Sequence, residues 1–209
     1  MSIVTHGCSF TSYKWACWPN FISWFVNEEV VNRGELGSAN ETIARKVIES
    51  ANENFNHVYI MWSATDRYEV MLQNGNIKTG GHPVKTHHDY YVRNFLNEEQ
   101  NMYRTLEKIL LVQLFLNSKN IPYTMMIWKG DILSKKYAIH NDIDWGKFKF
   151  YKQDQGLWEF AQDNYKQYYI PGESHPPPIA HYHWVKDIIF QSDVKCPDAE
   201  YRKLKEWKI

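Results

Sequence analysis

The sequence has few cysteines, no long apolar run and no excess of charge of either sign. Its 209 residues include only three cysteines, Cys8, Cys17 and Cys196, a number too small and odd for a disulfide framework. This favours a reducing compartment. Without an apolar run of about 18 residues, no membrane-spanning helix is expected. Lys plus Arg and Asp plus Glu number 24 each, so we expect no broad electrostatic binding to nucleic acid or to an anionic membrane.

The first residues lack a basic segment followed by an apolar stretch, so no signal peptide is expected and a cytoplasmic location is predicted. Aromatic residues, in contrast, are abundant at 16% of the chain. They suit either an aromatic-rich core and surface or a ligand-binding cleft. The length predicts a single domain over 1–190, with long insertions at about 68–94 and 129–171 and a C-terminal tail over 191–209.

Short apolar or β-branched segments alternate along the chain with helical patterns. Strands are expected at 2–5, 30–32, 57–62 and 122–128, and helices at 15–29, 42–54, 95–119, 157–164 and 179–191. Segment 68–92 is expected to be irregular. The alternation predicts an α/β fold of three layers, α/β/α, around a flavodoxin-like parallel sheet. In such a sheet, chemistry occurs just past the carboxyl ends of the strands.

Ser9 directly follows the first expected strand, on a Gly-Cys-Ser-Phe turn. A serine hydroxyl is a weak nucleophile and needs a base. His175 is a candidate because three prolines after it stiffen its loop, and Glu173 could orient its imidazole. From the residues alone, a single serine after a strand is more often an ordinary turn residue.

The order of four short blocks resembles the SGNH/GDSL hydrolase family. The first block is Gly7-Cys8-Ser9-Phe10 and the second is 32–40, which contains Gly37 and Asn40. The third is the strand at 58–61 followed by Trp62-Ser63-Ala64-Thr65-Asp66, and the last is Glu173-Ser174-His175-Pro176. Trp-Ser followed by Arg67 in the third block is also similar to hydrolase-like proteins of tailed bacteriophages.

The resemblance implies a role for each matching residue. Ser9 would attack an ester carbonyl, His175 would act as the base, and Glu173 would hold the histidine. The oxyanion hole would comprise the backbone N–H groups of Ser9 and Gly37. Thr65 stands where the family has an asparagine donor, and Asn40 or Ser63 could substitute for it. Substrate binding would fall to Arg67, Trp62 and Ser63.

The resemblance thus implies an SGNH-type serine esterase or acylhydrolase that works through an acyl-serine intermediate. The expected substrate is a small acyl ester or an acylated carbohydrate, for example an O-acetyl group. The alternative is a catalytically inactive protein of the same fold that binds carbohydrate or has a structural role. No cofactor, no metal site, no nucleic-acid partner and no membrane partner are expected, and the oligomeric state is not predicted.

Overall fold

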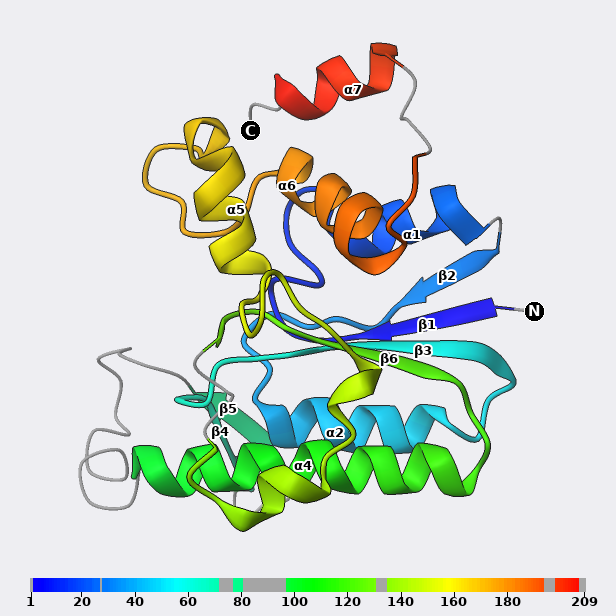
Figure 1. The fold of residues 1–209 in the computed structure, drawn as a ribbon, viewed down its shortest axis with the longest axis vertical. Coiled ribbons are helices and arrows are strands. Elements are labelled where there is room, and N and C mark those ends of the chain that lie inside the picture. The colour runs from blue at the N-terminus through cyan, green and yellow to red at the C-terminus, as the bar shows by residue number, and fades with distance from the viewer. Residues whose placement is uncertain are drawn as a thin grey trace.

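Five parallel strands form the central sheet of the computed structural model, which describes residues 2–26, 28–71, 77–80, 97–130, 135–193 and 198–206. Their order is β2-β1-β3-β6-β7 (Figure 1), which is the order of a flavodoxin-like doubly wound sheet. The strands are β1 (Ser2–His6), β2 (Glu29–Asn32), β3 (Phe55–Trp62), β6 (Tyr123–Ile127) and β7 (Phe148–Lys149). The predicted fold class is confirmed. The fifth strand was not predicted, because its two residues carry no period to detect.

Helices cover both faces of this sheet (Figure 1). On one face lie α1 (Trp18–Val26), α5 (Leu157–Tyr165) and α6 (Pro178–His183), with α7 (Asp198–Lys205) against α6. On the other face lie α2 (Asn40–Ser50) and α4 (Glu98–Ser118). A π-helix (Trp184–Ile189) continues α6, and short 3-10 helices lie at Ala138–Asp142, Trp145–Lys147 and Lys166–Tyr168. The three-layer arrangement is therefore as predicted.

The strand residues alternate between two cores because successive side chains of a strand point to opposite faces. In β3, Tyr59 and Met61 pack with the α1, α5 and α6 side, while Ile60 and Trp62 pack with the α2 and α4 side. Both faces of β3 are thus buried. This explains why the strand reads as a nearly continuous apolar run instead of an alternating one.

Two sequence expectations differ from the structure. Segment 68–92 was expected to be irregular, yet β4 (Tyr68–Met71) and β5 (Ile77–Gly80) form an antiparallel pair, with β4 against α2. Residues 72–76 and 81–94 of the first predicted insertion, and 131–134 of the second, lie outside the described residues. The first helix is shorter than the predicted 15–29, since it starts at Trp18 with Pro19 in its first turn. Within the described residues, no helix combines the length and the apolar character that crossing a membrane requires.

Candidate functional site

The turn that carries Ser9 begins directly after β1 and is held by its own backbone. The N–H groups of Thr11 and Ser12 donate to the carbonyl oxygen of Cys8 at 2.8 and 3.1 Å. Gly7 is required here, because a Cβ on it would lie 2.0 Å from the Thr11 hydroxyl oxygen and 2.9 Å from the Met61 carbonyl oxygen. The tight turn leaves Ser9 only 5% exposed, at the carboxyl edge of the sheet.

His175 reaches Ser9 from the far end of the chain. Its Nε2 lies 2.9 Å from the Ser9 Oγ, a contact between residues 166 positions apart in sequence. The histidine loop is anchored by the Trp15 indole N–H, which donates to the Pro176 carbonyl oxygen at 3.0 Å. Burial lowers the pKa of His175 to about 4, so its ring is neutral at pH 7 and able to accept a proton.

Glu173 does not occupy the position expected of the third triad residue. One carboxylate oxygen accepts a hydrogen bond from the Tyr13 hydroxyl at 2.8 Å, and the other pairs with the Lys14 ammonium. These bonds, that from Lys14 first, hold the pKa of Glu173 below its usual value. The Nδ1 of His175 is buried and has no hydrogen-bond partner among the described residues. Glu173 therefore makes no direct hydrogen bond to His175 in this structure, and its charge raises the pKa of the histidine.

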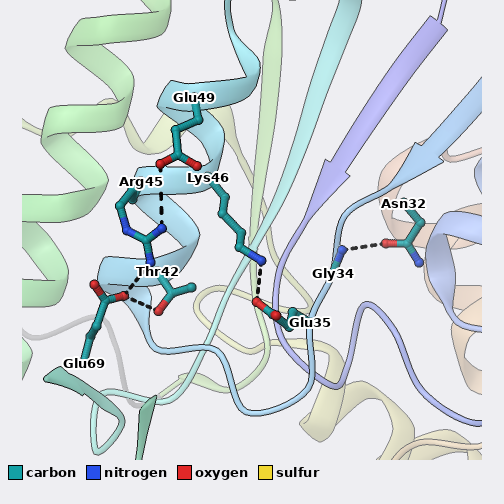
Figure 2. A network of polar contacts seen from close by, with 8 residues as sticks. All are labelled: Asn32, Gly34, Glu35, Thr42, Arg45, Lys46, Glu49 and Glu69. Carbon is teal, nitrogen blue, oxygen red and sulfur yellow. Dashed lines mark hydrogen bonds and ion pairs between the residues drawn. The ribbon is translucent and has the colours of Figure 1, made fainter. Parts of the chain in front are cut away.

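The loop between β2 and α2 carries Gly37, which has a left-handed backbone with φ of 78°. Its start is fixed by Asn32, whose Oδ1 accepts from the Gly34 N–H at 2.9 Å and whose Nδ2 donates to the Thr11 carbonyl oxygen at 2.9 Å. Figure 2 shows the Gly34 bond together with an ion pair that joins Glu35 of this loop to Lys46 of α2. The Glu35 N–H also donates to the Gly7 carbonyl oxygen at 3.0 Å, so the loop lies beside the Ser9 turn.

Two backbone donors of the predicted oxyanion hole are available. Across the part of the chain that the structure describes, no hydrogen bond is found for the N–H of Ser9 or of Gly37. Thr65 is half-buried after β3.

Asn40, in contrast, has no free donor. Its Nδ2 donates to the Ser63 carbonyl oxygen at 3.1 Å and to the Thr105 Oγ1 at 3.0 Å, while its Oδ1 accepts from the Ser63 N–H at 2.7 Å. The expectation that Asn40 donates to an oxyanion is therefore not what the structure shows. Its amide links the start of α2 to the end of β3.

The three residues expected to bind substrate differ in their placement. Trp62 and Ser63 are both 0% exposed, with Trp62 in the core beside α2 and α4, so neither is open to a substrate in this structure. The reason is that β3 is still buried on both faces where it ends. Arg67 is half-buried and donates to the Ser38 carbonyl oxygen at 3.2 Å. Its charge contributes to lowering the pKa of His175, which places the guanidinium in the electrostatic neighbourhood of the site.

The residues that surround the His175 ring were missed in the sequence. Tyr13 stacks on the imidazole, with ring centroids 3.9 Å apart and planes at 16°, and Phe10 lies 5.4 Å away. Their one sequence signal is that Phe10 belongs to the Ser9 turn and Tyr13 to the aromatic-rich segment just after it. Among the described residues, no three His, Cys, Asp or Glu side chains gather as a metal site.

Comparison with known proteins gives matches only among solved structures. No protein-family model and no curated protein matches the chain. A protein of the lipolytic G-D-S-L family from Veillonella parvula DSM 2008 is 13% identical, over 91% of this chain and 98% of that chain, with a TM-score of 0.49.

Two further solved structures are similar over part of their length. A protein from Desulfitobacterium hafniense DCB-2 that is assigned to the same lipolytic family is 16% identical over 68% of this chain, with a TM-score of 0.40. The acetyl xylan esterase Est2A from the rumen bacterium Butyrivibrio proteoclasticus is 8% identical over 68% of this chain, also with a TM-score of 0.40. The chain spans 64% of the first protein and 50% of the second. The structural neighbours are thus G-D-S-L lipolytic proteins and esterases, while the architecture of this chain rests on its own sheet topology.

Proposed function

We propose that this chain is a serine hydrolase that cleaves carboxylic esters. The observation that carries the proposal is the 2.9 Å contact between the Ser9 Oγ and the His175 Nε2 at the carboxyl edge of the sheet. A nucleophile on a tight turn and a neutral imidazole within hydrogen-bond distance are the pair that acyl transfer requires.

In the proposed reaction, the Ser9 Oγ attacks the ester carbonyl carbon as the His175 Nε2 takes the hydroxyl proton. The tetrahedral intermediate collapses, the carbon–oxygen bond to the alcohol breaks, and the imidazolium returns the proton to the leaving alkoxide. Water then attacks the acyl-serine carbonyl and gives a proton to His175. Collapse releases the carboxylic acid, and the proton returns to Ser9.

The negative oxygen of both tetrahedral intermediates needs donors, and the backbone N–H groups of Ser9 and Gly37 are assigned to it. Neither is used elsewhere in the described structure. The Thr65 hydroxyl is the third candidate. One such donor contributes about 3 kcal/mol to stabilising the transition state.

The proposed substrate class is a short acyl ester, with O-acetyl groups on carbohydrate as the first to test. Its support is two half-buried aromatic side chains near the histidine: Tyr13, which stacks on the imidazole, and Trp128, which packs edge-on against the buried Phe10 at 5.1 Å. Aromatic faces suit the apolar faces of sugar rings. Arg67 supplies a positive charge near the site for a polar or anionic alcohol.

The test is covalent labelling with a fluorophosphonate, read by intact mass between pH 6 and 9. We expect one adduct on the wild type, none on Ser9→Ala, and a large loss of rate in His175→Ala. Hydrolysis of an aryl acetate compared with an O-acetylated oligosaccharide then tests the substrate class. A folded wild-type protein that gains no adduct would overturn the proposal.

One observation favours the second candidate, a non-catalytic carbohydrate-binding protein of the same fold. The His175 Nδ1 has no carboxylate partner among the described residues, because Glu173 is held by Tyr13 and Lys14. Failure of labelling together with binding in a glycan-binding assay would support this alternative.

A further inference from the structure

The His175 imidazole needs a source of orientation that the usual triad does not provide here. In serine hydrolases with a full triad, a carboxylate bonded to Nδ1 holds the ring in place. In the described part of this chain, the Nδ1 is buried and unpaired. The Ser9 Oγ contacts the ring only at Nε2, and one hydrogen bond leaves the ring free to rotate about the axis of that bond.

An aromatic ring restrains this rotation. Tyr13 lies nearly parallel to the imidazole, at 16° and 3.9 Å between centroids, which is a stacked pair. Phe10 contacts the same imidazole at 5.4 Å and 44°. Rotation of the imidazole out of its plane would bring its edge into the Tyr13 ring. The stack therefore fixes the plane of the imidazole, and the hydrogen bond to Ser9 sets which nitrogen faces the Ser9 Oγ.

Tyr13 is itself held from two directions. Trp15 packs edge-on against it, with centroids 4.6 Å apart and planes at 76°, and the Tyr13 hydroxyl donates to Glu173 at 2.8 Å. The Trp15 indole N–H bonds the Pro176 carbonyl oxygen, one residue after the histidine. Segment 13–15 thus contacts the histidine loop at three points: Glu173, the ring of His175 and Pro176.

We propose that Tyr13 is the positioning residue of the catalytic histidine, its stacked ring taking the orienting role that a carboxylate on Nδ1 has elsewhere. This proposal rests on the proposed esterase function. In this proposal, Glu173 holds the Tyr13 hydroxyl. The segment that follows the nucleophile Ser9 then also orients the base His175.

The surroundings of His175 determine its pKa, and therefore the pH at which labelling of Ser9 is lost. Burial is the main cause that lowers the pKa of His175, Glu173 opposes it, and the charges of Arg67 and Lys14 add to it. The pKa of His181, buried in α6, is lowered to about 3, mainly by burial and also by the charge of His175, so His181 is neutral when His175 titrates. Removal of the Tyr13 ring admits water to the imidazole, so the pKa of His175 is expected to rise from about 4 toward its usual value.

The experiment compares Tyr13→Leu with Tyr13→Phe in fluorophosphonate labelling of Ser9 across pH. We expect Tyr13→Leu to react about tenfold or more slowly, because the base is misplaced, and its acid limb to move to higher pH. Tyr13→Phe retains the ring and is expected to react at nearly the wild-type rate. Tyr103→Leu, the same loss at an exposed tyrosine of α4, is the matched control.

The outcomes separate the two proposals. A wild type that does not label overturns the esterase function. A wild type that labels, with Tyr13→Leu equally fast, overturns only the positioning role. If Tyr13→Phe is as slow as Tyr13→Leu, the hydroxyl bond to Glu173 and not the stack orients the base, and the proposal also fails. NMR titration of the His175 ring measures its pKa directly, without any reaction. Loss of the Tyr13 ring is expected to raise this pKa, so an unchanged value in folded Tyr13→Leu would contradict the stack.

Discussion

Replacing Glu173 by Gln separates the observed geometry from that of a full catalytic triad. Loss of the carboxylate that orients a triad histidine costs about 10⁴-fold in rate in serine proteases. Here the two carboxylate oxygens bond Tyr13 and Lys14, and Glu173 acts on His175 directly only through its charge. Glutamine keeps the length of the side chain and an oxygen that accepts from Tyr13. Because the residue is partly solvated, we expect its lost charge to lower the labelling rate by less than about tenfold.

The assay is the second-order rate constant of fluorophosphonate labelling of Ser9, followed by aryl acetate hydrolysis. Glu69→Gln is the matched control, since Glu69 also accepts from a hydroxyl, that of Thr42, and pairs with a cation, Arg45 (Figure 2). A loss of a thousandfold or more in Glu173→Gln, with Glu69→Gln unchanged, would refute the reasoning. It would show that Glu173 moves onto the His175 Nδ1 during the reaction.

Four further results are expected. Labelling of Ser9 stays constant from about pH 5 upward and falls only near pH 4, since the pKa of His175 is about 4; a midpoint near 6.5 would contradict this. Burial lowers the pKa of His6 and of His181 to about 3, so the unfolded chain binds more protons below pH 6.5. The free energy of unfolding, measured by urea titration, should therefore fall by about 1.4 kcal/mol per pH unit for each of them, and a flat profile between pH 6 and 4 would argue against it. Gly7→Ala should cost about 1–3 kcal/mol through overpacking, checked by thermal unfolding, and an unchanged Tm would be inconsistent with the close approach. Asn40→Ala leaves buried backbone groups unpaired and should cost about 3 kcal/mol; a loss below 1 kcal/mol in the same assay would count against the three observed bonds.

The sheet was predictable because its strands are short apolar runs between helical patterns. The nearly continuous apolar sequence of β3 indicates burial on both faces, as observed. The predicted α/β/α architecture is confirmed. β7 was not predictable, since two residues form no pattern and pair with β6 only once the chain is folded.

The sequence indicated which residues to expect near the site, but it did not indicate which of them contact one another. The motif order singled out Ser9 and His175, and the structure brings them together, while their roles remain predictions. The partners of Glu173 lie 160 and 159 positions away, at Tyr13 and Lys14, and no local pattern links them to it. Competition between a nearby cation and a neutral imidazole for one carboxylate is decided by distance in the folded chain.

The loop that carries Gly37 is clamped at each end by the side-chain amide of an asparagine. Asn32 binds the loop at its start to the Ser9 turn, and Asn40 joins its end to the backbone N–H and carbonyl oxygen of Ser63, as a residue of a neighbouring strand would. The seven residues in between therefore have little conformational freedom to lose when a ligand arrives. Binding at this edge would then order no backbone. The amide hydrogens of 33–39, apart from that of Gly37, whose N–H is proposed to bind the oxyanion, would exchange at the same rates in free and ligand-bound protein.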